Sequence, residues 1–173
     1  MKKYLRIAGF LFMVYAIYAL IFASNPLTYT IYYPNQDGTH LIGVKGTERL
    51  EGLEAYNYAM SLLIRGPEDE DLVNPIPKGV RLVPFGDEVG PIVIDEDEKI
   101  AMVNFSKELV ENHPGGSTGE TMTVASIVNT LTSFRDIEKV GIYVEGELID
   151  TLAGHLELNQ PLTEFSDLIE QGD

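Results

Sequence analysis

The sequence contains no cysteine, and basic residues are few. The lack of cysteine excludes disulfides, thiolate catalysis and zinc–cysteine sites, so a stable domain must depend on its packed core. The 173 residues carry 27 acidic and 12 basic side chains. An acidic surface keeps a protein soluble and repels nucleic acids and anionic headgroups, which are bound through a basic footprint. We therefore predict no nucleic-acid partner.

A long run without charge lies near the N-terminus. Ile7 to Ala23 follows a basic head at residues 1–6 and is 17 residues long. This is near the lower limit for a transmembrane helix and longer than most signal-peptide cores. An uncleaved signal anchor is the favoured interpretation, and a cleaved signal is the alternative, since Ile21 and Phe22 match a small-x-small cleavage pattern poorly. Positive charge before the span predicts a cytoplasmic head and an extracytoplasmic domain at the cell membrane.

The remainder of the chain is long enough for one domain with its own core. Residues 24–27 are predicted to be a linker, residues 28–162 the domain, and residues 163–173 a C-terminal tail. All 27 acids and 9 of the 12 basic residues lie beyond residue 23, which gives this part a net charge of −18. We predict an α+β fold in which two main helices pack on one small, mostly antiparallel sheet.

Periodicity predicts the individual elements. Alternating or β-branched runs predict strands, and apolar residues at helical spacing predict two helices. The first helix ends at Gly66-Pro67, and its apolar stripe comprises Leu53, Tyr56, Ala59, Met60, Leu63 and Ile64; the second carries Val124, Ile127, Val128, Leu131 and Phe134. Strands are predicted at residues 27–33, 39–44, 79–85, 139–144 and 147–150, with a hairpin at 91–105 and a weak helical turn near the C-terminus.

The stretch HPGGSTGET, residues 113–121, raises the question of a functional site. A phosphate loop would need a lysine after Gly119, but Glu120 stands there. A serine nucleophile would need a base and an orienting acid; His113 could serve Ser117, but no carboxylate partner is obvious and the G-x-S-x-G elbow is missing. The favoured interpretation is a capping box, in which Ser117 caps the second helix and Glu120 reaches back to it.

Other candidate ligands are also better explained by structure. The acidic run Asp95 to Glu98 lacks the spaced oxygens and glycine of an EF-hand loop, so we predict a solvated turn. His40 and His155 show no metal-ligand spacing, and His155 is interpreted as a structural residue that bonds nearby backbone. No rule of sequence spacing predicts that Asp150 pairs with His155. We predict no catalytic, cofactor-binding or metal-binding residues, and no enzyme activity.

A series of short sequences resembles the GerMN domain, the sporulation and spore germination domain. They occur in the family's order and span nearly all of residues 28–162. The series comprises TIYYPNQDGTHL, LLIRGP, IPKGVRL, MVNFSKEL, GGSTGE, IVNTLTSF, KVGIYVEGE and AGHLELNQPL. The resemblance implies a membrane-anchored, extracytoplasmic domain without enzymatic activity, with a ring-building fold of helices on a small sheet. The chain has length for only one such domain and lacks the lipoprotein cysteine of some members.

Three functions compete at this point. The favoured one is a non-enzymatic scaffold that helps to assemble an envelope complex, with envelope or membrane proteins as partners and self-association when Ile7 to Ala23 tethers the copies. The second is a cell-wall-binding accessory that supports a peptidoglycan amidase or a signalling system. The third, a hydrolase that uses Ser117 or the carboxylates, lacks a nucleophile–base pattern.

Overall fold

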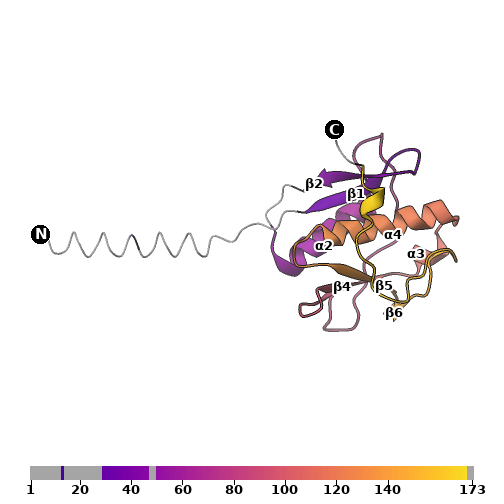
Figure 1. The fold of residues 1–173 in the computed structure, drawn as a ribbon. Coiled ribbons are helices and arrows are strands. Elements are labelled where there is room, and N and C mark those ends of the chain that lie inside the picture. The colour runs from indigo at the N-terminus through magenta and orange to yellow at the C-terminus, as the bar shows by residue number, and fades with distance from the viewer. Residues whose placement is uncertain (1–12, 14–28, 47–49, 171–173) are drawn as a thin grey trace, which may run out of the picture.

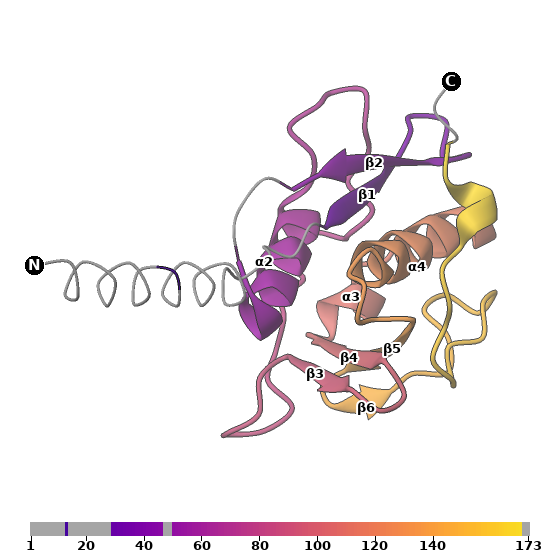
Figure 2. The same cartoon turned by 60° about the vertical axis from the view of Figure 1, so that its left-hand side comes forward.

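A computed structural model describes Met13, residues 29–46 and residues 50–170. Two sheets lie on opposite sides of a central helix, α4 (Ser117–Thr132), as both views show (Figures 1 and 2). The α+β class is confirmed. The prediction of a single sheet is wrong, because the strands divide into a two-stranded and a four-stranded sheet. The pairing is mostly antiparallel, as predicted, and only the central pair of the four-stranded sheet is parallel among the described strands.

The two-stranded sheet is the predicted N-terminal hairpin. β1 (Thr30–Pro34) pairs antiparallel with β2 (Leu41–Lys45). The other edge of β1 meets α4: the Thr30 N–H donates to Ser133 Oγ at 2.9 Å, and the Tyr32 N–H donates to Thr130 Oγ1 at 3.1 Å. Hydroxyl groups thus satisfy an edge that would otherwise present unpaired donors.

The four-stranded sheet has the order β3-β4-β5-β6. Its strands are β3 (Ile92–Asp95), β4 (Ile100–Phe105), β5 (Lys139–Val144) and β6 (Glu147–Leu148). α4 connects β4 to β5, and such a crossover makes that pair parallel. Short α3 (Glu108–Glu111) precedes α4.

The predicted strand at residues 79–85 is wrong. This segment makes only one isolated bridge, between Leu82 and Phe105. Hydrogen bonds link it to the end of β4, where the Val83 N–H donates to Asn104 O at 3.0 Å. The Asn104 N–H, which would make the next bond of this ladder, donates instead to Pro91 O at 2.8 Å, so the bridge does not extend into a strand.

Helix α2 (Gly52–Arg65) packs against both α4 and β1. It ends at Gly66 as predicted, and this glycine has a φ of 91°, a region that side-chain-bearing residues rarely adopt. Tyr56, Ala59, Met60 and Leu63 of its predicted stripe are buried. Leu53, at the start of the stripe, was expected in the core but is 51% exposed, because it lies beyond the part of the helix that the core covers.

Helix α4 is buried on nearly every side. Its predicted apolar stripe is confirmed, since all five residues are fully buried. Several polar residues of α4 are buried as well, because the helix lies between two layers. Asn129 accepts from the Phe165 N–H at 2.8 Å and donates to Phe165 O at 3.2 Å, and so holds the C-terminal segment where it crosses the helix (Figure 2).

The predicted C-terminal tail is residues 163–173. Its described residues, 163–170, are bonded to the rest of the domain. It contains a short 3-10 helix, η1 (Ser166–Leu168), which confirms the expected helical turn. Beyond it the Glu170 N–H donates to Leu41 O at 3.0 Å, next to an isolated bridge between Ile169 and Leu41. The predicted anchor, residues 7–23, lies outside the described residues except for Met13. Within the described ranges no helix has the length and hydropathy needed to cross a bilayer.

Candidate functional site

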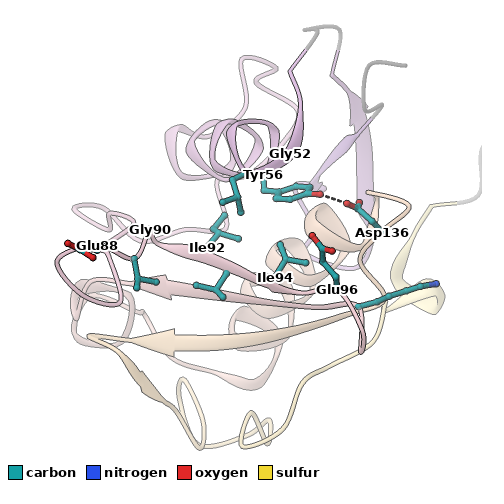
Figure 3. A pocket seen from close by; sticks show the side chains of 12 residues that line it. Gly52, Tyr56, Glu88, Gly90, Ile92, Ile94, Glu96 and Asp136 are labelled. Carbon is teal, nitrogen blue, oxygen red and sulfur yellow. Dashed lines mark hydrogen bonds between the residues drawn. The ribbon is translucent and has the colours of Figure 1, made fainter. Parts of the chain in front are cut away.

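A groove of about 660 Å³ lies between the start of α2 and strand β3. We call it the α2–β3 groove. Figure 3 shows Ile92 and Ile94 on β3 below Tyr56 of α2, with Glu88 toward one end and Glu96 and Asp136 toward the other. Its lining comprises Gly52, Leu53, Tyr56, Glu88, Val89, Gly90, Ile92, Val93, Ile94, Glu96, Lys99 and Asp136.

Apolar side chains of the groove reach the surface. Leu53 is 51% and Val89 46% exposed, while Ile92, which also lines the groove, is buried. A single exposed leucine is ordinary, but exposed apolar residues that border a concave apolar site are typical of binding surfaces. Leu53 is the residue whose periodicity had suggested a core position. Its exposure places an apolar side chain at the mouth of the groove.

A hydrogen bond between a tyrosine and a carboxylate fixes one end of the groove. The Tyr56 hydroxyl donates to Asp136 Oδ2, in the residues that follow α4. Burial, followed by this hydrogen bond and the negative charge of Asp136, raises the pKa of Tyr56 above its usual value. Tyr56 therefore stays neutral and acts as a donor. The Tyr56 ring also packs edge-to-face on Phe134, with centroids 4.8 Å apart.

β3 is the terminal strand of its sheet, and among the described residues no strand pairs with its outer edge. The Asn104 N–H donates to Pro91 O at 2.8 Å, in register with the β3–β4 ladder. Because antiparallel strands alternate between bonded and non-bonded pairs, Val93 and Asp95 also face β4. The N–H and C=O groups of Ile92 and Ile94 consequently point away from β4, toward the outer edge.

The HPGGSTGET stretch begins a helix, but the predicted capping box is wrong. Gly116 is the N-cap of α4, and no side chain caps this end. Ser117 is the first helical residue and is exposed. Gly115 and Gly116 have φ values of 80° and 83°, which explains the two glycines without any anion site.

Glu120 is fully buried, and its carboxylate is the centre of a hydrogen-bond cluster. Oε1 accepts from Thr151 Oγ1 at 2.7 Å and from the N–H groups of Leu152 and Ala153 at 2.9 Å. Oε2 accepts from the His155 N–H at 2.8 Å. The 151–155 loop thus surrounds the carboxylate with donors, as backbone nests surround anions.

These four donors lower the pKa of Glu120 from 4.5 to about 2. Burial is the largest single influence and would raise the pKa, but the hydrogen bonds together outweigh it. Glu120 is therefore ionised at neutral pH and acts as a structural anion. In the sequence, the only signals were the short motifs GGSTGE and AGHLELNQPL of the family resemblance, and no rule joins these two distant segments.

His113 does not serve Ser117. Its Nδ1 accepts from the Gly115 N–H at 3.0 Å, so its Nε2 carries the proton and donates to Thr123 Oγ1 at 3.1 Å. The Thr123 hydroxyl in turn donates to Pro75 O at 2.8 Å. Burial lowers the pKa of His113, although the negative charge of Glu120 acts in the opposite direction. The lowered pKa favours the neutral ring.

The remaining candidates belong to no group of three or more potential metal ligands among the described residues. His40 is exposed before β2, with its Nδ1 3.0 Å from Thr39 Oγ1. His155 has an exposed side chain and contributes its backbone N–H to Glu120; among the described residues no hydrogen bond joins it to Asp150. Asp95 to Glu98 form the predicted turn, in which Asp95 Oδ1 accepts from the N–H groups of Asp97 and Glu98.

Gly116 and Ser117, at the start of α4, should respond differently to replacement by alanine. Replacing Gly116 by alanine should lower the free energy of unfolding by about 1 to 3 kcal/mol, because a side chain strains this positive-φ backbone. Replacing Ser117 by alanine should change it by less than about 0.5 kcal/mol, because the exposed hydroxyl caps nothing. Urea denaturation followed by circular dichroism measures both. A larger loss for Ser117→Ala than for Gly116→Ala would restore the capping box.

The family follows from this fold and sequence together. Residues 30–150 match the Germane family, described as sporulation and spore germination, and the chain belongs to this family. The family is a class of non-catalytic domains. None of the curated proteins compared with the chain is similar enough to match.

Solved structures confirm the GerMN fold. The tandem GerMN domains of the sporulation protein GerM from Bacillus subtilis match with a TM-score of 0.61 and 16% identity, over 79% of this chain and 46% of that one. The chain thus spans less than half of the tandem protein. The first GerMN domain of GerM has a TM-score of 0.57, 18% identity and coverages of 85% and 99%. A putative lipoprotein from Clostridium perfringens has a TM-score of 0.56, 24% identity and coverages of 80% and 88%.

Proposed function

We propose that this chain is a non-enzymatic, membrane-anchored GerMN-type protein that acts outside the cytoplasm in the assembly of an envelope complex, in sporulation or spore germination. The observation that carries the proposal is an apolar groove, bordered by exposed Leu53 and Val89 and by an open strand edge, on a domain of the Germane family. A surface of this kind suits a protein partner better than a reaction.

The anchor is the second part of the proposal. Lys2, Lys3 and Arg6 precede the uncharged run from Ile7 to Ala23, which supports a signal anchor with its domain outside. Tethering raises the local concentration of the domain and orients its copies, which offsets the mutual repulsion of a domain with a net charge of −18.

We expect the full-length chain to fractionate with membranes, and protease added outside intact protoplasts to remove the domain. A chain that lacks residues 1–23 and is fitted with a cleavable secretion signal should be released instead, because the apolar span is gone. Immunoblotting of membrane and supernatant fractions measures both. A soluble wild-type product that begins near Ser24 would contradict the uncleaved anchor.

The role in assembly is tested by in-cell cross-linking of the full-length chain. We expect cross-links to an envelope protein or to a second tethered copy, while the released chain stays mainly monomeric at micromolar concentration. Retention on purified cell wall without any protein cross-link would favour the wall-binding accessory. Hydrolysis of a cell-wall substrate by the purified chain would contradict the scaffold.

A further inference from the structure

We propose that the α2–β3 groove binds an extended protein segment that adds as a strand to the edge of β3, with apolar side chains in the groove and a basic residue at each end. This inference rests on the proposed function and specifies the partner of the groove. The partner is defined by chemistry: an exposed, basic and apolar stretch of another envelope protein.

The backbone supplies the first argument. The hydrogen bond from the Asn104 N–H to Pro91 O fixes which residues of β3 direct their backbone groups toward β4. By the alternation of an antiparallel pair, Ile92 and Ile94 each present one N–H and one C=O outward. An added strand forms main-chain hydrogen bonds with such an edge, and pockets for alternate side chains give specificity. The opposite edge of this sheet, β6, has only two residues and offers a shorter template.

The side chains supply the second argument. Ile92 and Ile94 line the groove from β3 and Tyr56 lines it from α2, while the lining residues Leu53 and Val89 are exposed. From Gly90 to Glu96 an extended chain covers about 20 Å, at about 3.3 Å per residue. A segment of about seven residues therefore fills the groove, with every second side chain directed inward.

The charges decide the kind of partner. Of the charged residues that line the groove, Glu88, Glu96 and Asp136 are acidic and Lys99 is basic. Lys99 is already paired with Glu138, so its charge is compensated. Glu88 lies toward one end of the groove and Glu96 and Asp136 toward the other, which matches basic residues at both ends of a bound segment (Figure 3).

The same charges disfavour a second copy. Antiparallel pairing of two β3 edges would bring the acidic turn at residues 95–98 of one copy toward the Asp87-Glu88 loop of the other. Like charges placed together at an interface oppose binding. A basic segment from a different protein is therefore the occupant that the groove fits.

The test uses the full-length chain in neutral detergent and two fluorescent, end-blocked peptides. One is Lys-Val-Thr-Ile-Thr-Val-Lys, and the other has glutamate in place of both lysines. We expect the basic peptide to bind at least about tenfold more tightly, with the difference shrinking between about 0.1 M and 1 M salt. Hydrogen exchange at the Ile92 and Ile94 amides should slow at least about tenfold on saturation, because the added strand bonds them.

Two matched variants locate the site. Leu53→Lys removes an exposed apolar contact and adds a repelling charge, and should weaken binding at least about tenfold. Leu148→Lys makes the same change on β6, where the leucine is 38% exposed, and should leave binding unchanged. Melting curves confirm that both variants are folded.

Several outcomes would overturn this inference: no binding, equal binding of both peptides, insensitivity to Leu53→Lys, or unchanged exchange at Ile92 and Ile94. If the chain self-associates and Leu53→Lys abolishes this self-association, the occupant of the groove would be a second copy of the chain and not a basic partner. If the peptide fails but the anchored chain still cross-links to an envelope protein, only the groove assignment falls. If the cross-links fail as well, the proposed function falls with it.

Discussion

Replacing Glu120 by glutamine is expected to lower the free energy of unfolding by about 3 kcal/mol at neutral pH. The wild-type carboxylate accepts four hydrogen bonds, and its pKa falls from 4.5 to about 2 on folding. A neutral amide has one oxygen to accept these bonds and brings two N–H groups into a cluster of donors. Urea denaturation of both chains, followed by circular dichroism, measures the difference.

The same substitution should change the dependence of stability on pH. Because folding lowers the pKa of Glu120, its stabilisation is complete above the unfolded value of 4.5 and is lost as the pH falls through about 2. The difference between wild type and Glu120→Gln should therefore shrink to roughly half by about pH 3. Glu157→Gln, an exposed change on the same C-terminal segment, is the control. A difference that stays constant with pH would show that the charge of Glu120 has no part in it.

Replacing Phe134 by alanine is expected to cost about 3 to 5 kcal/mol in unfolding free energy, the usual range for a large cavity. Phe134 is fully buried, and its ring stacks on Tyr29 with centroids 5.4 Å apart and meets Tyr56 edge-to-face. Denaturation measures the loss. Near-ultraviolet circular dichroism should also change, because both tyrosines lose a neighbouring ring.

Phe134→Leu is the matched control for this position. Leucine keeps much of the volume, so we expect a smaller loss of roughly 1 to 2 kcal/mol. Because Tyr56 is part of the groove, Phe134→Ala should also weaken binding of the basic peptide, whereas Phe134→Leu should preserve most of it. Equal losses of stability for the two variants would argue against a tightly packed aromatic cluster.

Periodicity predicted the helices and hairpins whose buried residues lie close together in the sequence. The apolar stripe of α4 was found because its residues repeat at helical spacing, and the hairpins were found because alternation and turn residues agree. The same reasoning misplaced Leu53, because spacing identifies a helix face and carries no information on how far the core extends along it. It also produced a strand at residues 79–85, where the pairing stops because the Asn104 N–H of β4 is bonded to Pro91.

The polar interior and the groove could not be predicted, because their partners are distant in the sequence. Thr130 meets the backbone of Tyr32, 98 residues away, and Glu120 meets a loop 31 to 35 residues away. The groove combines α2, the loop before β3, the 95–98 turn and Asp136. No local rule assigns such contacts, so the capping box was the nearest available explanation for Ser117 and Glu120.

The contacts between the C-terminal segment and α4 have a consequence for folding during synthesis, because the chain is made from its N-terminus. Among the described residues, the side chain of Glu120 obtains its donors from residues 151–155, and the side chain of Asn129 bonds Phe165. A nascent chain that ends before residue 150 would bury a carboxylate with none of these donors, which is costly. The polar packing around the central helix can therefore be completed only after residues 151–165 have been synthesised.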